Sequence, residues 1–399
     1  MSCNSALLRG EEYTERREGE MRRKWQNLPD ELILKILSYL EVKDLISCGQ
    51  LSKRTRNISQ DGSLWVTANL KKKIVNIELL EMILLKGCKN LNLSNSTIVG
   101  HLRSNMIVPR RHAATAGSRN MISQLRILDL SQSTWGFPAR KKPAQVYHKE
   151  NISKIEDLLF SCCSLQNLKM EGLLITSKMA VSICKNGPTL QVLNLNHSFV
   201  QDTFDSLDYE VPNGDFQSII KSCQQLKELD LNYVVFASHI ANVNEGLSDD
   251  DLEILAKNVS PNVEKLNLIN QDIGDELVKI MLSRSNKIKL LTLEASYISD
   301  ESLKTIGQYL NLALRELTLG YHSSRKLFTH GFLELKFMPR LKILNIYIRR
   351  ALNDCNKEIQ NLRQHLPHLM IRTFYEGCFY SLENGAYLWG IQQLRGPQF

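Results

Sequence analysis

Aliphatic residues recur along most of the chain in the pattern Leu-x-x-Leu-x-Leu, in which Val, Ile, Met or Cys can replace a leucine. Alternating apolar and polar positions are typical of a strand with one buried face, so each copy predicts a short strand with its leucines pointing inward. Nine clear copies start at Leu125, Leu165, Leu190, Leu226, Val263, Ile288, Leu314, Leu341 and Leu366, and a degenerate copy starts at Cys88.

The spacing of these copies predicts the architecture. From Val263 onwards the starts lie 25, 26, 27 and 25 residues apart, which is within the range of leucine-rich repeats. One repeat cannot bury its apolar stripe alone, whereas stacked repeats can. The chain is therefore predicted to be α/β, with a curved leucine-rich-repeat solenoid whose concave side is a parallel β-sheet.

The segments between the strands predict helices on the outer face of the solenoid. Ser248 precedes three aspartates and is a good helix start, because side-chain oxygens and negative charge suit the free N–H groups there. The predicted buried stripes are Leu252, Leu255, Ala256 and Val259 in one helix, and Ile273, Leu277, Ile280 and Met281 in the next.

Three gaps between copies are longer and predict insertions. Residues 131–153 contain a basic run and two prolines and predict a mobile loop, and residues 196–215 are acidic with a Pro-Asn-Gly turn. Residues 234–251 lead into the helix after Ser248. Loops on a rigid array often carry binding contacts, but the favoured interpretation of these segments is a tolerated surface insertion.

A different pattern stands before the repeats. In LPDELILKILSYL, the residues Leu32, Ile33, Ile36, Leu37 and Leu40 share one side of a helix. Pro29 suits the first turn, and the two acidic residues after it suit the positive end of the helix dipole. The helical region is small for an independent core, so it is expected to need a neighbour. That neighbour is either another chain or the solenoid, for which the helices would be a cap.

The motifs in this region resemble the F-box family. The matching positions are Leu28-Pro29, Glu31-Leu32, Ile36, Leu40, Asp44-Leu45, Lys53-Arg54, Ile58 and Leu64-Trp65, with Thr55 where the family often has a Trp. The resemblance implies binding to the Skp adaptor of cullin-RING (SCF) ubiquitin ligases, and through it association with cullin and RING subunits. The implied adaptor-binding residues are Leu28, Pro29, Leu32, Ile36, Leu40, Leu45, Ile58, Leu64 and Trp65.

An F-box followed by leucine-rich repeats resembles the branch of the family that marks cyclin-dependent-kinase inhibitors for destruction. This implies a cell-cycle substrate, a Cks accessory subunit, residence in the nucleus and cytoplasm, and a C-terminal tail along the concave face. The predicted divisions are a disordered segment 1–23, an F-box 24–70, a linker with the degenerate first repeat 71–124, repeats 125–375 and the tail 376–399.

The concave sheet is the predicted substrate surface. Residues between the last two aliphatic positions of each copy face outward, and an aromatic and basic cluster lies beyond the later strands. Arginine pairs bidentately with phosphate, so this cluster suits a phosphorylated or acidic degron. Outward polar residues could equally serve only to keep the sheet soluble. The predicted substrate-binding residues are Asn267, Thr292, Thr318, Tyr321, His322, Asn345, Tyr347, Arg349 and Arg350, and earlier outward positions are Asp129, Lys169, Asn194 and Asp230.

Composition narrows the function classes. The formal charge is +8, and the basic clusters fall in linkers, so nucleic acid is not an expected partner. No apolar run can span a bilayer, and the N-terminus does not have the pattern of a secretory signal. Nine cysteines without a C-x-x-C pair indicate a reducing compartment and buried thiols, with no metal or cofactor expected.

The sequence contains neither G-x-S-x-G nor H-E-x-x-H, and a repeat array provides no closed pocket, so an enzyme is not expected. The favoured interpretation is a non-catalytic substrate receptor of a ubiquitin ligase. The alternative is a non-ligase leucine-rich-repeat scaffold whose front helices only cap the solenoid.

Overall fold

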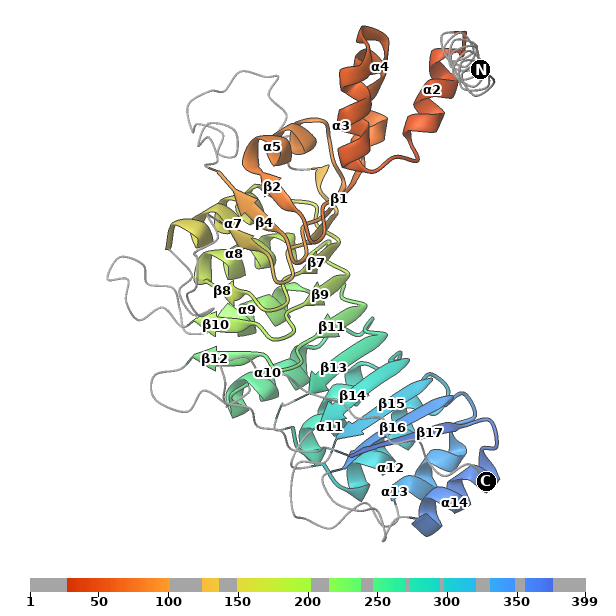
Figure 1. Ribbon diagram of the computed structural model, residues 1–399. Helices are drawn as coiled ribbons and strands as arrows, with labels where there is room; N and C mark the ends of the chain where they lie inside the picture. Colours follow the sequence, from red (N-terminus) through yellow and green to blue (C-terminus); the bar gives the residue numbers. More distant parts are fainter. Residues whose placement is uncertain are drawn as a thin grey trace, which may run out of the picture.

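The computed structural model describes residues 27–100, 124–135, 149–201, 215–237, 247–269, 271, 273–294, 298–320, 331–348 and 356–375. These residues form a curved solenoid in which parallel strands line one side and helices line the other (Figure 1). The predicted disordered segment 1–23 and the predicted tail 376–399 lie outside the described residues.

The central element is an 11-stranded parallel sheet, so the predicted solenoid with a parallel sheet is confirmed. Its register places the second aliphatic residue of one repeat beside that of the next: Leu128 pairs with Leu168, and Leu266 pairs with Leu291. The strands, in order, are β1 (Thr67–Asn69), β3 (Asn90–Asn92), β5 (Ile127–Asp129), β7 (Asn167–Lys169), β9 (Val192–Asn194), β11 (Glu228–Asp230), β13 (Lys265–Ile269), β14 (Leu290–Glu294), β15 (Glu316–Gly320), β16 (Ile343–Ile348) and β17 (Met370–Tyr375).

The core runs the length of the solenoid behind this sheet. The inward leucines of successive strands, such as Leu168, Leu193 and Leu266, are fully buried. Helices cover them from the convex side. These are α5 (Ile77–Leu85), α7 (Lys149–Ser161), α8 (Ser177–Asn186), α9 (Asp215–Ser222), α10 (Asp249–Asn258), α11 (Asp275–Arg284), α12 (Asp300–Leu310), α13 (Gly331–Glu334), the 3₁₀ turn η3 (Leu335–Phe337) and α14 (Asn356–His365).

The structure agrees with one predicted helix and corrects the buried face of the other. Helix α10 begins after Ser248, whose hydroxyl accepts a hydrogen bond from the Asp251 N–H at 3.2 Å, and its predicted stripe is buried. In α11 the buried residues are Val278, Met281 and Leu282, together with Ile273 just before the helix. The predicted Leu277 and Ile280 are only partly buried at the edge of the core.

The predicted insertions contribute one or two strands each time to two further sheets, whose other strands lie outside the insertions. One contains β2 (Ile74–Asn76), β4 (Thr97–Val99) and β6 (Thr134–Trp135), and the other contains β8 (Leu174–Ile175), β10 (Phe199–Gln201) and β12 (Val235–Ala237). The chain reaches each of them through a sharp turn, and residues such as Gln132 (φ 53°) and Tyr233 (φ 51°) adopt the left-handed conformation there. The predicted loop 131–153 is therefore wrong for β6 and for the start of α7, and its middle, 136–148, lies outside the described residues.

The two ends of the solenoid differ from the sequence alignment of the repeats. At the front, Ala68 of β1 pairs with Leu91, so the repeats begin within the last residues predicted as F-box. At the far end, Leu344 pairs with Ile371 rather than with Leu369, so the last repeat is shifted by two residues. Leu369 instead donates its N–H to the Leu366 carbonyl in the turn after α14, where a proline separates these two residues.

Buried carboxamides join neighbouring repeats. Asn186, at the end of α8, is almost fully buried, and its Nδ2 donates to the carbonyls of Cys162 (3.0 Å) and Ser182 (2.9 Å). Its Oδ1 accepts from the Leu165 N–H at 3.0 Å. The side chain therefore satisfies backbone groups of the preceding repeat that would otherwise be buried without partners.

We predict that Asn186→Leu lowers the free energy of unfolding by about 2–4 kcal/mol, because the Leu165 N–H and the Cys162 carbonyl lose their partners while the volume is kept. Urea denaturation followed by circular dichroism measures the change. Asn311→Leu, at an exposed position after α12, is the matched control and should change stability by less than about 0.5 kcal/mol. Equal stability of the two variants would contradict the assigned role of Asn186.

Candidate functional site

Three short helices precede the solenoid: α2 (Asp30–Leu37), α3 (Val42–Leu51) and α4 (Lys53–Ser59), followed by the 3₁₀ turn η1 (Gly62–Trp65). Helix α2 stands beside the α3–α4 pair at the front end of the solenoid (Figure 1). The turn η1 ends at Trp65 and β1 begins at Thr67, so this helical module continues directly into the first strand of the sheet.

The module has its own internal supports. Trp65 is buried, and its Nε1 donates to the Ser59 carbonyl at 2.8 Å. Ser52 and Thr55 form a reciprocal capping box at the start of α4, with both backbone-to-side-chain distances at 3.1 Å. Thr55 is 3 % exposed, so the position where the family often has a Trp is a buried cap in this chain.

Charged pairs fix the module at both of its ends. Arg54 on α4 donates through Nε to Asp30 Oδ1 at 2.8 Å and also bonds to the Leu28 carbonyl, so it holds the first turn of α2. Lys73 donates to Glu41 at 2.7 Å, which connects the helices to the first repeat. The hydrogen bond and the charge of Lys73 lower the pKa of the Glu41 carboxyl. Both pairs are solvent-exposed, so they orient the helices more than they stabilise them.

The apolar side of α2 divides into two faces. Ile33 and Leu37 are buried beneath the helix, at 0 % and 2 % exposure. Leu32 and Ile36 point outward and are 51 % and 42 % exposed, and Tyr39, one turn further on, is 77 % exposed. We call Leu32, Ile36 and Tyr39 the outer α2 face. Large apolar side chains aligned on one side of a helix and uncovered in this way are typical of a protein interface.

The predicted adaptor-binding residues separate in the same way. Leu28, Leu40 and Leu64 are partly exposed, and Pro29, Leu32 and Ile36 are exposed. Three of them pack inside the module, and their part in adaptor binding stays a prediction. These are Leu45, Ile58 and Trp65, which are 2–9 % exposed.

Two exposed apolar residues were missed by the sequence reasoning. Tyr39, in the turn after α2, and Leu51, the last residue of α3, are 77 % and 76 % exposed. Tyr39 lies seven residues after Leu32, and that helical spacing was the signal that could have identified it. The sequence instead favours a buried position for Leu51, because Leu51 stands with Leu45 and Ile46 in the apolar pattern of α3.

The predicted substrate surface is only partly visible. Asn267 and Thr292 lie on the concave side and are half-buried, and Asn267 Nδ2 donates to Asp230 at 3.1 Å. Thr318 and Asn345 were expected to be open to solvent but are each only 8 % exposed. The structure therefore corrects their exposure: Asn345 Nδ2 donates to Thr318 (3.0 Å) and to the Glu316 carboxylate (3.1 Å), so adjacent strands cover each other's polar groups.

Among the described residues, the buried Oδ1 of Asn345 has no hydrogen-bond partner. The rest of the predicted cluster cannot be placed. Tyr321, His322, Arg349 and Arg350 lie outside the described residues, and only the backbone of Tyr347, in β16, is described.

Among the described cysteines, the buried thiols have raised pKa values. Burial raises the pKa of the Cys88 thiol to about 11 and those of Cys162 and Cys223 to about 12. Cys163, next to Cys162 in sequence, is exposed. In the described part of the chain, no three His, Cys, Asp or Glu side chains come together as a metal site. None of the described helices is long and apolar enough to cross a membrane.

Comparison with known proteins identifies the front module. A family model described as F-box-like matches residues 25–71. The TLR13–ssRNA13 complex matches at 17 % identity over 77 % of this chain and 39 % of that one, with a TM-score of 0.34. The leucine-rich repeat-containing protein LegL7 of Legionella pneumophila matches at 14 % identity over 70 % of this chain and 82 % of that one, with a TM-score of 0.33.

This chain covers less than half of the length of the first of these proteins. The TM-scores of both matches are low, so neither match supports a conclusion about function. The repeat assignment rests on the parallel sheet itself. Residues 25–71 are an F-box-like domain, and leucine-rich repeats follow it, so both parts of the predicted architecture are confirmed. F-box domains imply binding to a Skp-type adaptor, and F-box and leucine-rich-repeat proteins are typically non-catalytic receptors.

We predict that iodoacetamide at pH 8 labels Cys163 at least tenfold faster than Cys162 in the folded protein, because Cys163 is exposed, whereas burial shields Cys162 and raises the pKa of its thiol. Tandem mass spectrometry distinguishes the two sites, and unfolding in urea should equalise them. Because the unfolded thiols ionise near pH 9 and the buried ones do not, stability should also fall as the pH rises from about 9 towards 12. Equal labelling in the folded state would contradict the burial of Cys162.

Proposed function

We propose that this chain is the substrate-recognition subunit of an SCF-type ubiquitin ligase. It binds a Skp adaptor through the F-box and a protein substrate through the leucine-rich repeats. The observation that carries the proposal is the outer α2 face, where Leu32, Ile36 and Tyr39 are uncovered above the buried Ile33 and Leu37. An F-box-like domain with its own packed layer below and an unoccupied apolar layer above is suited to a helix-packed adaptor interface.

In this proposal the chain itself does no chemistry. Cullin and RING subunits, reached through the adaptor, position a ubiquitin-loaded enzyme, and the solenoid holds the substrate near it. Bringing a substrate lysine to a reactive thioester raises its effective concentration, which is sufficient for rate enhancement. The direct passage from η1 into β1 and the pair between Lys73 and Glu41 support this role, because they leave little freedom between the F-box and the solenoid.

The concave sheet near β15 and β16 is the proposed substrate surface. The unpartnered Oδ1 of Asn345 supports this placement, because a buried acceptor without a partner is costly unless a bound group donates to it. The phosphorylated cell-cycle substrate, the Cks subunit and residence in the nucleus and cytoplasm remain predictions, as does the resemblance to the S-phase-kinase-associated F-box protein.

One observation argues against the alternative in which the protein is a non-ligase scaffold and the front helices only cap the solenoid. Helices that only cap a solenoid need apolar residues directed at the repeats and polar residues outside. The outer α2 face has the opposite character, with three large apolar side chains directed at solvent. A cap alone does not explain that face.

We predict that Leu32→Asp with Ile36→Asp weakens binding to a purified Skp-type adaptor at least a hundredfold, because charged side chains would be buried in an apolar contact. Isothermal titration calorimetry with the full chain measures the affinity. The matched control is Leu312→Asp with Phe337→Asp, since these residues are 64 % and 61 % exposed elsewhere on the solenoid. Undiminished adaptor binding by the α2 variant, with an unchanged melting temperature, would reject the assignment.

A further inference from the structure

A row of charged side chains follows one edge of the concave sheet, where its strands begin. Each residue in the row comes directly after the first aliphatic position of a repeat. We call the row the basic rim. It consists of Lys89, Arg126, Gln166, Gln191, Lys227, Glu264, Lys289, Arg315 and Lys342.

Backbone hydrogen bonds hold these residues in order. The N–H of each one donates to the carbonyl of its predecessor, for example Arg126 to Lys89 (2.8 Å) and Arg315 to Lys289 (2.8 Å). Neighbouring strands lie about 4.8 Å apart, so the rim extends over roughly 38 Å along the solenoid axis. Residues up to 253 positions apart in sequence, from Lys89 to Lys342, therefore form one continuous line.

The charge of this line is strongly one-sided. Six of its members are cations and one is a carboxylate, which gives a net charge of +5. Lys289 pairs with Glu264 at 2.7 Å, and among the described residues it is the only rim cation with an ion-pair partner. Within the described part of the chain, neither Glu228 nor Glu316 forms an ion pair with a rim cation: Glu316 accepts a hydrogen bond from Asn345, and Glu228 is exposed.

The pKa of Glu264, the one acid of the rim, shows how strongly the surrounding cations act. The hydrogen bond from Lys289 lowers the pKa of Glu264, burial opposes this shift, and the charges of Lys289, Lys227 and Arg315 lower the pKa further. Cations from the repeats before and after Glu264 therefore act on the same carboxylate. A carboxylate supplied by another molecule would experience the same attraction at the unpaired positions of the rim.

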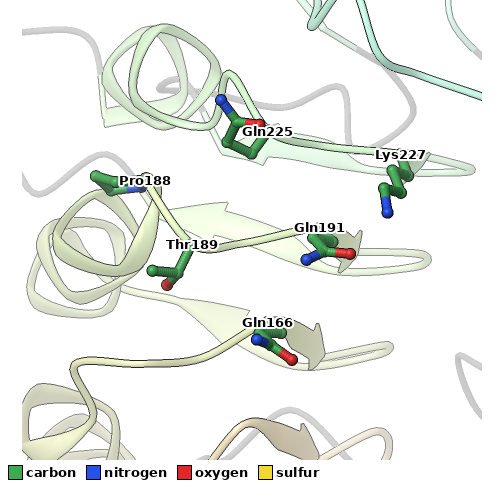
Figure 2. Close-up of a pocket in the computed structure, with 6 residues that line it drawn as sticks. All are labelled: Gln166, Pro188, Thr189, Gln191, Gln225 and Lys227. Carbon is green, nitrogen blue, oxygen red and sulfur yellow. The ribbon is translucent and has the colours of Figure 1, made fainter.

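The centre of the rim is hollowed and carries a single charge, that of Lys227. Gln166, Gln191 and Lys227 lie on three successive repeats beside Thr189 and Gln225 (Figure 2). Together with Pro188 they line an open depression of about 340 Å³. Carboxamides both donate and accept hydrogen bonds, so these side chains suit the backbone of an extended peptide.

We propose that the basic rim binds an extended acidic segment of a partner protein, about twelve residues long at roughly 3.3 Å per residue and rich in Asp or Glu. No member of the rim is aromatic, whereas single-stranded nucleic acid is usually held by aromatic stacking, so a protein segment is favoured. As a means of substrate capture the site rests on the proposed function. The binding itself does not require the adaptor, so its failure would leave the adaptor assignment intact.

Fluorescence anisotropy with the full chain tests this. The probe is a fluorescein-labelled (Glu-Ser)₆ peptide at about 50 mM salt, and a (Gln-Ser)₆ peptide is its uncharged match. Lys227→Glu with Arg315→Glu and Lys342→Glu should weaken binding of the acidic probe at least tenfold. The same change to Gln at these three positions, which carries less risk to folding, should weaken it by a smaller but measurable factor.

The control variant carries the same change in charge on the convex helices: Lys221→Glu with Lys279→Glu and Arg284→Glu, all at exposed positions. It should alter binding less than about twofold. Equal loss in the control and rim variants would show a diffuse charge effect and overturn the proposal. It would also be overturned if the (Gln-Ser)₆ peptide bound equally well, or if a twelve-nucleotide single strand bound more tightly to the same residues.

Discussion

The parallel backbone ladder of the concave sheet is the constraint on which the rest of this structure depends. A strand of three residues with one inward leucine cannot persist alone, because its backbone groups and its apolar side chain both need neighbours. The ladder supplies both kinds of neighbour. Leu168, Leu193 and Leu229 lie side by side, and the backbone groups of each strand form hydrogen bonds with those of the next strand. Stability is therefore shared along the solenoid.

The same ladder determines where polar chemistry is displayed. Positions of equal rank in each repeat are brought within about 5 Å of one another, whatever their separation in sequence. This produces the hydrogen-bonded pair of Thr318 and Asn345 on the concave side and the line of cations along the basic rim. The F-box joins this frame through β1, so an adaptor on α2 would stand at a defined distance from both surfaces.

The sequence predicts what is periodic and fails where local contacts decide. The inward leucines and the cap at Ser248 were predictable, because spacing and capping chemistry are local. The first strand was missed because Trp65 and Ala68 stand where leucines are expected, and the final register could not be read past Pro367.

The division of α2 was not predictable either, because its five apolar residues share one side of the helix. Only the packing against the neighbouring helices decides that Ile33 lies inside and Leu32 outside. The basic rim was invisible as a unit, since its cations appear in the sequence as scattered residues. It becomes a surface only when the register of the strands is known.

The central claim is that the F-box connects the repeats to a ubiquitin ligase. Its most direct test is affinity purification of the tagged chain from cells treated with a proteasome inhibitor, followed by mass spectrometry. We expect recovery of a Skp-type adaptor together with cullin and RING subunits. Recovery of proteins bound to the repeats, with no adaptor or cullin present, would contradict it.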